Sequence, residues 1–368
     1  MTHPRLTPLA LTLPETVPFV GPEAQERARG APFAARIGAN ESVFGPAPAA
    51  IAAMERAARE VWMYGDPESH DLRAALAAHH GVDITNVVVG EGIDGLLGYL
   101  VRLIAGPGDA VVTSDGAYPT FNYHVAGFGA ALHKVPYRDD HEDLPALIAR
   151  AAEVDARLIY LANPDNPMGT CHPGAEIVAA LDHLPPGCLL VLDEAYIELA
   201  PPGTAAPVAI DDPRVIRMRT FSKGHGMAGA RVGYALGAAP LIRAFEKVRN
   251  HFGMSRIAQA GALASLSDPG WLDLVRSEVV ASRARIAAIA AEAGLRALPS
   301  ATNFVAVDCG HDGAFARRVL DGLLARGVFA RMPGVAPLNR CIRISCGREA
   351  EMDVLAAALP AAVQAARG

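Results

Sequence analysis

FSKGHGMAGAR, residues 221–231, is the stretch on which the fold assignment depends, because its glycines follow the spacing G-x-G-x-x-G of dinucleotide-binding proteins. That motif needs a strand, a glycine turn, a full helix and a second strand. Here the next strand-like run, RVGYALG, begins at Arg231, so no crossover helix fits between the two strands. We therefore expect no NAD site, and Lys223, just before the glycines, becomes the more informative residue.

On both sides of this stretch, short apolar runs alternate with longer amphipathic segments. The β-rich runs are Val87–Val89, Ala110–Thr113, Leu158–Leu161, Leu189–Leu192 and Val215–Met218. Such alternation predicts an α/β domain built on a largely parallel sheet. Towards the C-terminus, an alanine-rich helical segment (272–293) leads into the strand-like runs NFVAVD and CIRISCG, which predict a smaller α+β domain. We place the large domain at residues 34–265 and the small domain at 266–368.

Composition narrows the class of protein. Apolar residues make up 51% of the 368 residues, and the best candidate for a spanning helix, Leu96–Ala105, is short and contains Arg102. With a net charge of −6 and no basic cluster, the chain lacks the electrostatic footprint of a protein that binds nucleic acid or an anionic membrane. We expect a small-molecule substrate, and neither nucleic acid nor a membrane as a partner.

The cysteines and the N-terminal residues indicate the compartment. The five cysteines are odd in number and form no C-x-x-C pair, which disfavours a disulfide framework and a structural zinc site, so no metal is predicted. The first residues are interrupted by prolines and lack the pattern of an export signal. The expected location is the cytoplasm.

Polar and aromatic residues follow the predicted strands at the points where the strands end. In open α/β sheets, ligands bind outside the carboxyl ends of the strands. The residues found there are Gly92, Ile93 and Asp94 at a helix start, Tyr118 and Phe121, Asn166 within NPDNPMGT, Asp193 and Tyr196 within DEAY, and Ser222 with Lys223. We expect these side chains to meet at one edge of one sheet.

Together these residues match the chemistry of pyridoxal phosphate. A helix start, a hydroxyl and a permanent cation suit a phosphate, and they are provided by Ile93, Asp94, Ser222 and Arg231. Asp193 suits a ring nitrogen that must stay protonated, while Asn166 and Tyr196 suit a phenolic oxygen. Lys223 supplies the primary amine that forms a Schiff base with an aldehyde.

Each of these features also has a purely structural interpretation. A lysine in a glycine-rich loop is usually a solvated charge, DEAY after a strand is often a helix cap, and NPDNP is a good turn. Tyr118 and Phe121 are equally compatible with a place in the core. Their joint placement at the strand ends favours the cofactor site.

The motifs resemble those of the fold-type I pyridoxal-phosphate aminotransferases and, within them, the histidinol-phosphate aminotransferase group. The similar segments run in the family's order along nearly the whole chain: PFVGPEAQER, IGANESVFGP, YGDPESHDLRAALAAHHGV, NPDNPMGT, DEAYIEL, TFSKGHGMAGARVGY and CIRISCGRE. The resemblance implies the aspartate aminotransferase-like fold, with residues 1–33 as an N-terminal arm that packs against the small domain or a partner. It also implies pyridoxal 5'-phosphate as the cofactor and a homodimer with shared active sites.

Matched motif by motif, the resemblance implies a role for each candidate residue. Lys223 is the Schiff-base lysine and proton carrier, and the cofactor ring contacts Asp193, Tyr196, Asn166 and, by stacking, Phe121. The cofactor phosphate contacts Ile93, Asp94, Ser222, Arg231 and, from the second subunit, Tyr64. The substrate pocket contains Asn40, Arg343 for an α-carboxylate or phosphate, and Arg331 for a distal anion.

The implied reaction is a ping-pong transfer of an amino group between an amino acid or histidinol phosphate and 2-oxoglutarate or glutamate. Two alternatives stay open: an aminotransferase for an aromatic or other amino acid, and a decarboxylase of a phosphorylated amino acid on the same scaffold. A ligand-sensing relic of the fold is disfavoured, because Lys223, Asp193 and Tyr196 are intact. ESVFGP (41–46) departs from the family's E-N-P-Y-G-P, and His225 from its usual aromatic or small residue, so the substrate pair and the pathway stay open.

Overall fold

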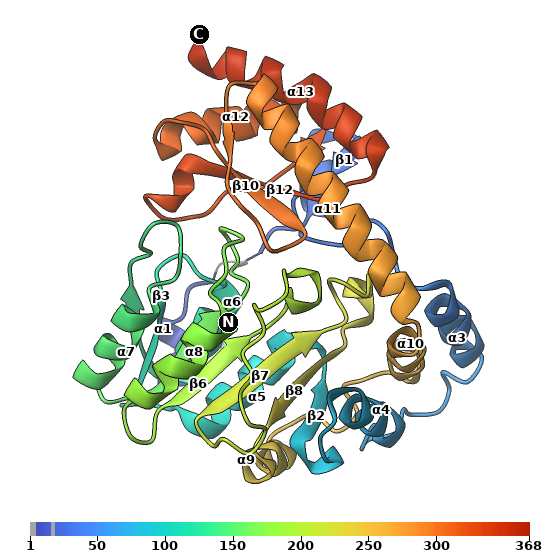
Figure 1. Cartoon of the computed structure of the whole chain (residues 1–368), viewed down its shortest axis with the longest axis vertical. Coiled ribbons are helices and arrows are strands. Elements are labelled where there is room, and N and C mark those ends of the chain that lie inside the picture. Colours follow the sequence, from blue (N-terminus) through green and yellow to red (C-terminus); the bar gives the residue numbers. More distant parts are fainter. Residues whose placement is uncertain (1–4, 16–18) are drawn as a thin grey trace.

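The structure, a computed structural model, describes residues 5–15 and 19–368 and has two bodies, each built on its own sheet (Figure 1). The larger sheet has the described strand order β2-β8-β7-β6-β5-β3-β4. Its strands are β2 (Val87–Gly90), β3 (Ala110–Ser114), β4 (Ala131–Val135), β5 (Ala156–Ala162), β6 (Leu189–Asp193), β7 (Val215–Thr220) and β8 (Gly233–Gly237). Strands β3 to β7 pair in parallel, and β8 runs antiparallel to β2 and β7. The predicted α/β fold with a mainly parallel sheet is confirmed.

The strands of this sheet are continuous apolar runs because helices cover both of its faces. On one face, α5 (Gly92–Ile104) and α6 (Pro119–Gly127) pack into a core with Val111, Tyr160 and Val191. On the other face, α7 (Leu144–Glu153) and α8 (Gly174–Ala180) pack against the alternate side chains of the same strands. A third cluster joins β2 and β8 to α3 (Pro48–Ala58), α4 (His70–His80) and α10 (Arg256–Leu266). The short α9 (Ala239–Ala244) follows β8.

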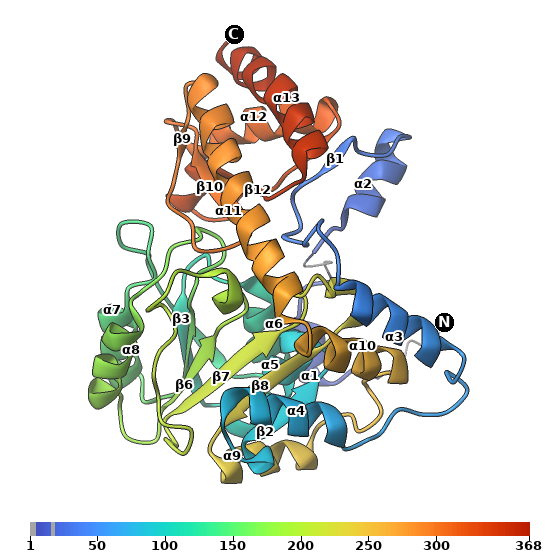
Figure 2. The ribbon, with the colours of Figure 1, turned by 45° about the vertical axis from the view of Figure 1, so that its right-hand side comes forward.

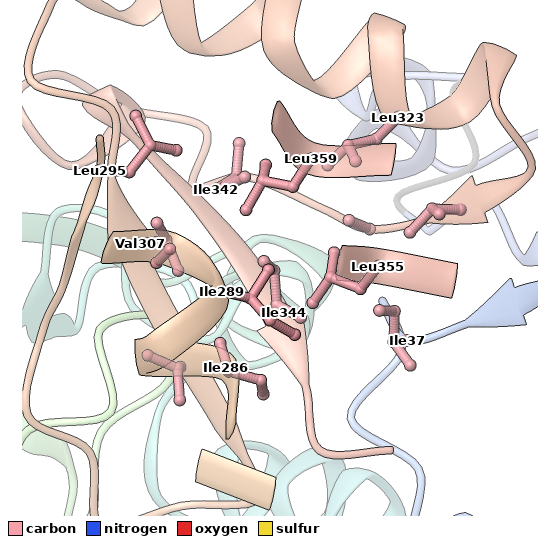
Figure 3. Close-up of a cluster of buried hydrophobic side chains, with 14 of the residues drawn as sticks. Ile37, Ile286, Ile289, Leu295, Val307, Leu323, Ile342, Ile344, Leu355 and Leu359 are labelled. Atoms are coloured by element: carbon pink, nitrogen blue, oxygen red, sulfur yellow. The ribbon is translucent and has the colours of Figure 1, made fainter. Parts of the chain in front are cut away.

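The second body contains most of the C-terminal residues. Its antiparallel sheet consists of β9 (Arg296–Ala297), β10 (Phe304–Asp308) and β12 (Cys341–Ser345), with β10 in the centre. It packs against α11 (Pro269–Glu292), α12 (Gly313–Ala325) and α13 (Glu349–Arg367). Figure 3 shows this core, where Ile286, Ile342 and Leu355 meet side chains from several elements.

Residues near position 36 belong to this second body. β1 (Ala35–Arg36) pairs in parallel with β11 (Val328–Phe329), and Ile37 is fully buried in the same core (Figure 3). Ala35 and Ile37, predicted to lie in a large domain that starts at residue 34, pack in the core of the C-terminal body instead. The reason is a long-range strand pairing that no local pattern reveals.

The N-terminal segment contacts both bodies. α2 (Pro22–Arg29) lies beside β1 (Figure 2), and the Phe33 backbone N–H that follows it donates to Glu26 Oε1 at 2.9 Å. α1 (Pro8–Thr12) lies near the large sheet, where Leu9 approaches Gly129. Within the described ranges, no helix has the length and apolarity that a bilayer crossing requires.

Candidate active site

A cavity of about 500 Å³ lies at the carboxyl ends of the parallel strands, with walls from both bodies. Its lining includes most of the residues expected at the strand ends, namely Ile93, Asp94, Tyr118, Asn166, Asp193, Tyr196, Ser222 and Lys223, together with Asn40, Arg231 and Arg343. The parallel register causes this convergence, since Ala162 at the end of β5 faces Asp193 at the end of β6. These side chains meet at one edge of the sheet as expected, whereas Phe121 does not line the cavity. A more open groove of about 1050 Å³, lined by other residues, lies between α7 and α8.

Lys223 lies in the glycine-rich loop that follows β7. Its ammonium nitrogen Nζ donates a hydrogen bond to the carbonyl oxygen of Asn40 at 2.9 Å and lies 5.5 Å from the centre of the Tyr196 ring. Burial, with a smaller contribution from the Arg343 guanidinium, lowers the pKa of Lys223 to about 8. A larger fraction of the amine is therefore uncharged near neutral pH than in a solvated lysine, as a nucleophile or general base requires.

Asp193 ends β6 and is 5% exposed. Its Oδ1 accepts the backbone N–H of Ala195 at 2.9 Å, and its Oδ2 accepts the hydroxyl of Tyr160 at 2.7 Å. Burial raises the pKa of Asp193 to about 6, while these two donors and nearby Lys223 oppose that rise. The carboxylate is thus charged at neutral pH and suited to a cationic partner in the cavity.

The start of α5 forms a cradle with Ser222 and Arg231. Gly92 has a φ of +76°, and a Cβ there would lie 2.3 Å from Nη2 of Arg231, so only glycine lets the guanidinium approach the helix start this closely. Arg231 also donates through Nη1 to Ser222 Oγ at 3.3 Å, and its Nη2 lies 3.9 Å from Oδ2 of Asp94. A cation, a hydroxyl and free helix N–H groups meet here, which is the donor set of a phosphate site.

Arg343 extends from β12 into the cavity. Its Nη1 donates to Oδ1 of Asn166, and its Nη2 donates to the Gly38 carbonyl oxygen at 3.4 Å. In the described part of the chain, its buried Nε has no hydrogen-bond partner. Burial lowers the pKa of Arg343, so an anion in this position would offset the cost of burying the charge.

Asn40 connects these groups. It has a φ of 55°, in the left-handed region, and its side-chain N–H donates to the Tyr196 hydroxyl at 3.1 Å. Ser345 holds this conformation, because its hydroxyl accepts the Asn40 backbone N–H and donates to Asn40 Oδ1, both at 3.0 Å. Asn40 therefore ties Lys223 and Tyr196 to the strand that carries Arg343.

Phe121 was expected to stack on the cofactor ring, and its position corrects that expectation. Its side chain is fully buried and stacks on Tyr160, with ring centres 4.5 Å apart, and it does not line the cavity. Tyr118, three residues earlier, lines the cavity and donates to Asp94 Oδ1 at 2.7 Å. Tyr118 ends the loop before α6, whereas Phe121 lies within the helix and faces the core.

Two further predicted residues lie outside the lining of the cavity. The Arg331 guanidinium stacks on the Phe19 ring at 3.7 Å and donates to the Val20 carbonyl oxygen, so Phe19 takes its place in the cavity wall. Tyr64 is 79% exposed and packs beside Phe252, with ring centres 4.8 Å apart.

The cavity lining also includes residues that were not predicted from the sequence, among them Phe19, Glu41 and Tyr160. The sequence could have indicated a role for Tyr160, because a tyrosine inside a fully apolar strand needs a buried hydrogen-bond partner for its hydroxyl. It gives no such indication for Phe19 and Glu41, since their positions depend on the path of the N-terminal segment between the two bodies.

The residues present fit pyridoxal phosphate. The cradle at Gly92 has the donors of a phosphate site, the buried carboxylate of Asp193 suits a protonated ring nitrogen, and Lys223 offers an amine of lowered pKa between them. An aromatic wall, Tyr118, lies beside the same cavity.

Comparison with known proteins agrees with this chemistry. The family model "Aminotransferase class I and II" matches residues 35–359. The histidinol-phosphate aminotransferase of Moorella thermoacetica is 31% identical over 362 residues, which cover 97% of this chain and 93% of that protein. The aromatic amino acid aminotransferase of Mycolicibacterium paratuberculosis is 34% identical, covering 93% and 97% of the two chains.

The solved structures extend the agreement to the fold. The histidinol-phosphate aminotransferase from Sinorhizobium meliloti, solved in complex with pyridoxal-5'-phosphate, is 56% identical, with a TM-score of 0.96 over 99% of this chain and 98% of that one. With a family model across most of its length and a cavity whose donors suit the cofactor, the chain belongs to the class I and II aminotransferases and is a pyridoxal-phosphate-dependent transaminase.

Proposed function

We propose that the chain transfers the amino group of histidinol phosphate to 2-oxoglutarate, with the cofactor and the substrate in the cavity at the strand ends. The strongest support is the similarity to the Sinorhizobium meliloti enzyme over nearly the full length. The half-buried Arg343, whose buried Nε has no partner in the described ranges, adds a binding group for the substrate phosphate.

The proposed roles follow from the contacts of each residue. When bound, the cofactor supplies an aldehyde and an electron-withdrawing ring. Lys223 Nζ would hold the aldehyde, and its free amine would take the α-proton of the substrate. Asp193 would hold the ring nitrogen, Asn166 and Tyr196 the phenolic oxygen, and Tyr118 would pack against the ring. Ile93, Asp94, Ser222 and Arg231 would hold the phosphate.

Steady-state kinetics with a panel of amino donors tests the substrate. We expect kcat/KM for histidinol phosphate to exceed that for phenylalanine or arginine by about 100-fold or more, because a phosphate dianion pairs with the Arg343 guanidinium more strongly than an α-carboxylate does. The aromatic amino acid aminotransferase relative and the aromatic wall of Tyr118 and Phe19 favour a second candidate, an aromatic donor. A preference for phenylalanine would select it. Membership of the aminotransferase family disfavours the decarboxylase and the ligand-sensing alternatives.

Replacement of Arg343 by lysine should separate the contribution of its positive charge to substrate binding from that of its donor geometry. Arg343→Lys keeps a cation but loses the two-pronged donor, so we expect kcat/KM for histidinol phosphate to fall about 100-fold, mainly through KM. The matched control is Arg340→Lys, since Arg340 pairs with Asp140 and Asp308 outside the cavity. An equal fall of kcat/KM for histidinol phosphate in Arg340→Lys and Arg343→Lys would contradict the role of Arg343.

A homodimer with Tyr64 at the partner's cofactor phosphate is also proposed. It is supported by a cluster of exposed aromatic side chains, Trp62, Tyr64 and Phe252, which are 81%, 79% and 56% exposed. Tyr64→Phe should weaken cofactor binding about tenfold and leave the oligomeric state unchanged, because it removes one hydrogen bond to a charged group. Tyr123→Phe, another exposed tyrosine, is the control, and size measurements accompany both. A fully active monomer would contradict the proposal.

The remaining proposals concern organisation and location. The division into an arm, a large domain and a small domain fits the two bodies, with the boundary moved from residue 34 to near residue 38 because Ile37 packs in the C-terminal core. Arg331 reaches a distal anion only if Phe19 moves aside. All five cysteines are free thiols, which suits a reducing compartment, and the cytoplasm remains the proposed location.

A further inference from the structure

Tyr160 is the side-chain hydrogen-bond donor to Asp193. It lies on β5, next to β6, and its hydroxyl donates to Asp193 Oδ2 at 2.7 Å. The backbone N–H of Ala195 occupies the other oxygen at 2.9 Å. With one donor on each oxygen, the plane of the carboxylate is fixed while further lone pairs stay available to a ligand in the cavity.

The Tyr160 ring is itself held in place. It is fully buried and stacks on Phe121 of α6, with ring centres 4.5 Å apart and an angle of 19° between the ring planes. Phe121 is also fully buried. The hydroxyl therefore has one accessible position, and Phe121 contributes to the site from behind Tyr160 rather than at the cavity wall.

The surroundings of Asp193 oppose its negative charge. Burial and the carboxylate of Asp94 favour the neutral form, while Lys223 opposes them. Glu142 is a further carboxyl in the same buried region, and the charge of Asp193 contributes to the raised pKa of Glu142. The donors Tyr160 and Ala195 stabilise the ionised form against burial and like charge. Removal of the Tyr160 hydroxyl leaves the backbone donor alone.

We propose that Tyr160 is a positioning residue for Asp193, whose hydrogen bond keeps the carboxylate charged and correctly oriented for the nitrogen of the cofactor ring. The inference rests on the proposed role of Asp193. It assigns to Tyr160 a function that the side chain performs through Asp193, without contact with the substrate.

Cofactor affinity of the apoenzyme as a function of pH tests this inference. Apoenzyme is titrated with pyridoxal phosphate from about pH 5.5 to about pH 9, a range that spans the protonation of a raised aspartate. For Tyr160→Phe we expect about tenfold weaker binding near neutral pH. The difference in cofactor affinity between Tyr160→Phe and the wild type should shrink as the pH rises, because Asp193 ionises at alkaline pH even without the hydrogen bond from Tyr160. In the holoenzyme, kcat should fall with little change in KM for the amino donor.

Tyr137→Phe is the matched control. The Tyr137 hydroxyl donates to another buried carboxylate, Oδ1 of Asp165, at the same 2.7 Å. The Tyr137→Phe variant should show the same dependence of cofactor affinity on pH as the wild type. A Tyr160→Phe profile equal to wild type, or a deficit of the same size at every pH, would overturn the inference.

A second variant covers the case in which Tyr160→Phe fails to fold. Phe121→Leu keeps the Tyr160 hydroxyl but removes the ring that fixes it, so the pH profile should shift in the same direction by a smaller amount. An unmoved profile in Phe121→Leu would overturn the inference. Wild-type apoenzyme that binds no cofactor would instead overturn the proposed site itself, which separates the two failures.

Discussion

Lys223→Ala is expected to reduce kcat by about 10⁴-fold or more, because it removes both the amine that would hold the cofactor and the base that would move the substrate proton. The variant should also lose the visible absorbance of the cofactor bound to lysine while keeping its fold. The chain has three lysines, Lys134, Lys223 and Lys247, which makes the control simple.

Lys247→Ala is the matched control, since Lys247 is exposed and lies at the end of a short 3₁₀ helix away from the cavity. It should keep the turnover and the absorbance of the wild type. Turnover retained in Lys223→Ala would remove the basis of the proposed mechanism, whatever the control does.

Asp193→Asn should lower kcat by about 10² to 10³-fold, because an amide does not stabilise a protonated ring nitrogen as a carboxylate does. The pKa of Asp193 is raised to about 6, so its carboxyl is charged above that pH and neutral below it. Wild-type apoenzyme should therefore lose cofactor affinity as the pH falls through about 6, and the asparagine variant should show no such loss. Binding titrations at several pH values measure both effects.

Glu194→Gln is the control for this prediction. Glu194 is the next residue, equally buried, but its carboxylate pairs with Arg219 at 2.7 Å. Its replacement should lower stability while the pH profile of cofactor affinity stays that of the wild type. A wild-type profile in Asp193→Asn would show that this aspartate does not face the ring nitrogen.

Much of the fold and of the site follows from local pattern. Apolar runs buried on both faces predicted the parallel strands, and parallel strands bring their ends to one edge. That geometry was enough to predict that Asp193, Ser222 and Lys223 meet in one cavity. Local pattern also excluded an NAD site at the glycine motif, since the strand that begins just after Arg231 leaves no room for the crossover helix that such a site needs.

The expectation for Phe121 depended on matching a motif without three-dimensional context. The family resemblance placed Phe121 at the tyrosine of a P-T-Y motif, but helix α6 begins at Pro119 and turns Phe121 towards the core, whereas Tyr118 precedes the helix and faces the cavity. A shift of three residues near a helix start changes which side chain reaches the cavity, and sequence spacing alone does not fix it.

Long-range contacts explain the other differences. Arg331 is covered by Phe19, more than 300 positions earlier in the chain, and β1 pairs with β11 across a similar distance. Such contacts depend on how the N-terminal segment runs between two bodies, so periodicity and local motifs carry no information about them. Tyr160 is the intermediate case, because its polar tip in an apolar strand indicated a partner without identifying Asp193.

The most direct test of the account is to locate the cofactor on the chain. Purified holoenzyme is treated with borohydride, which traps the cofactor on the amine that carries it, and peptide mass spectrometry identifies the modified residue. The account predicts a single modified peptide that contains Lys223. Modification of Lys134 or Lys247 instead, or a protein that carries no cofactor after loading with pyridoxal phosphate, would contradict it.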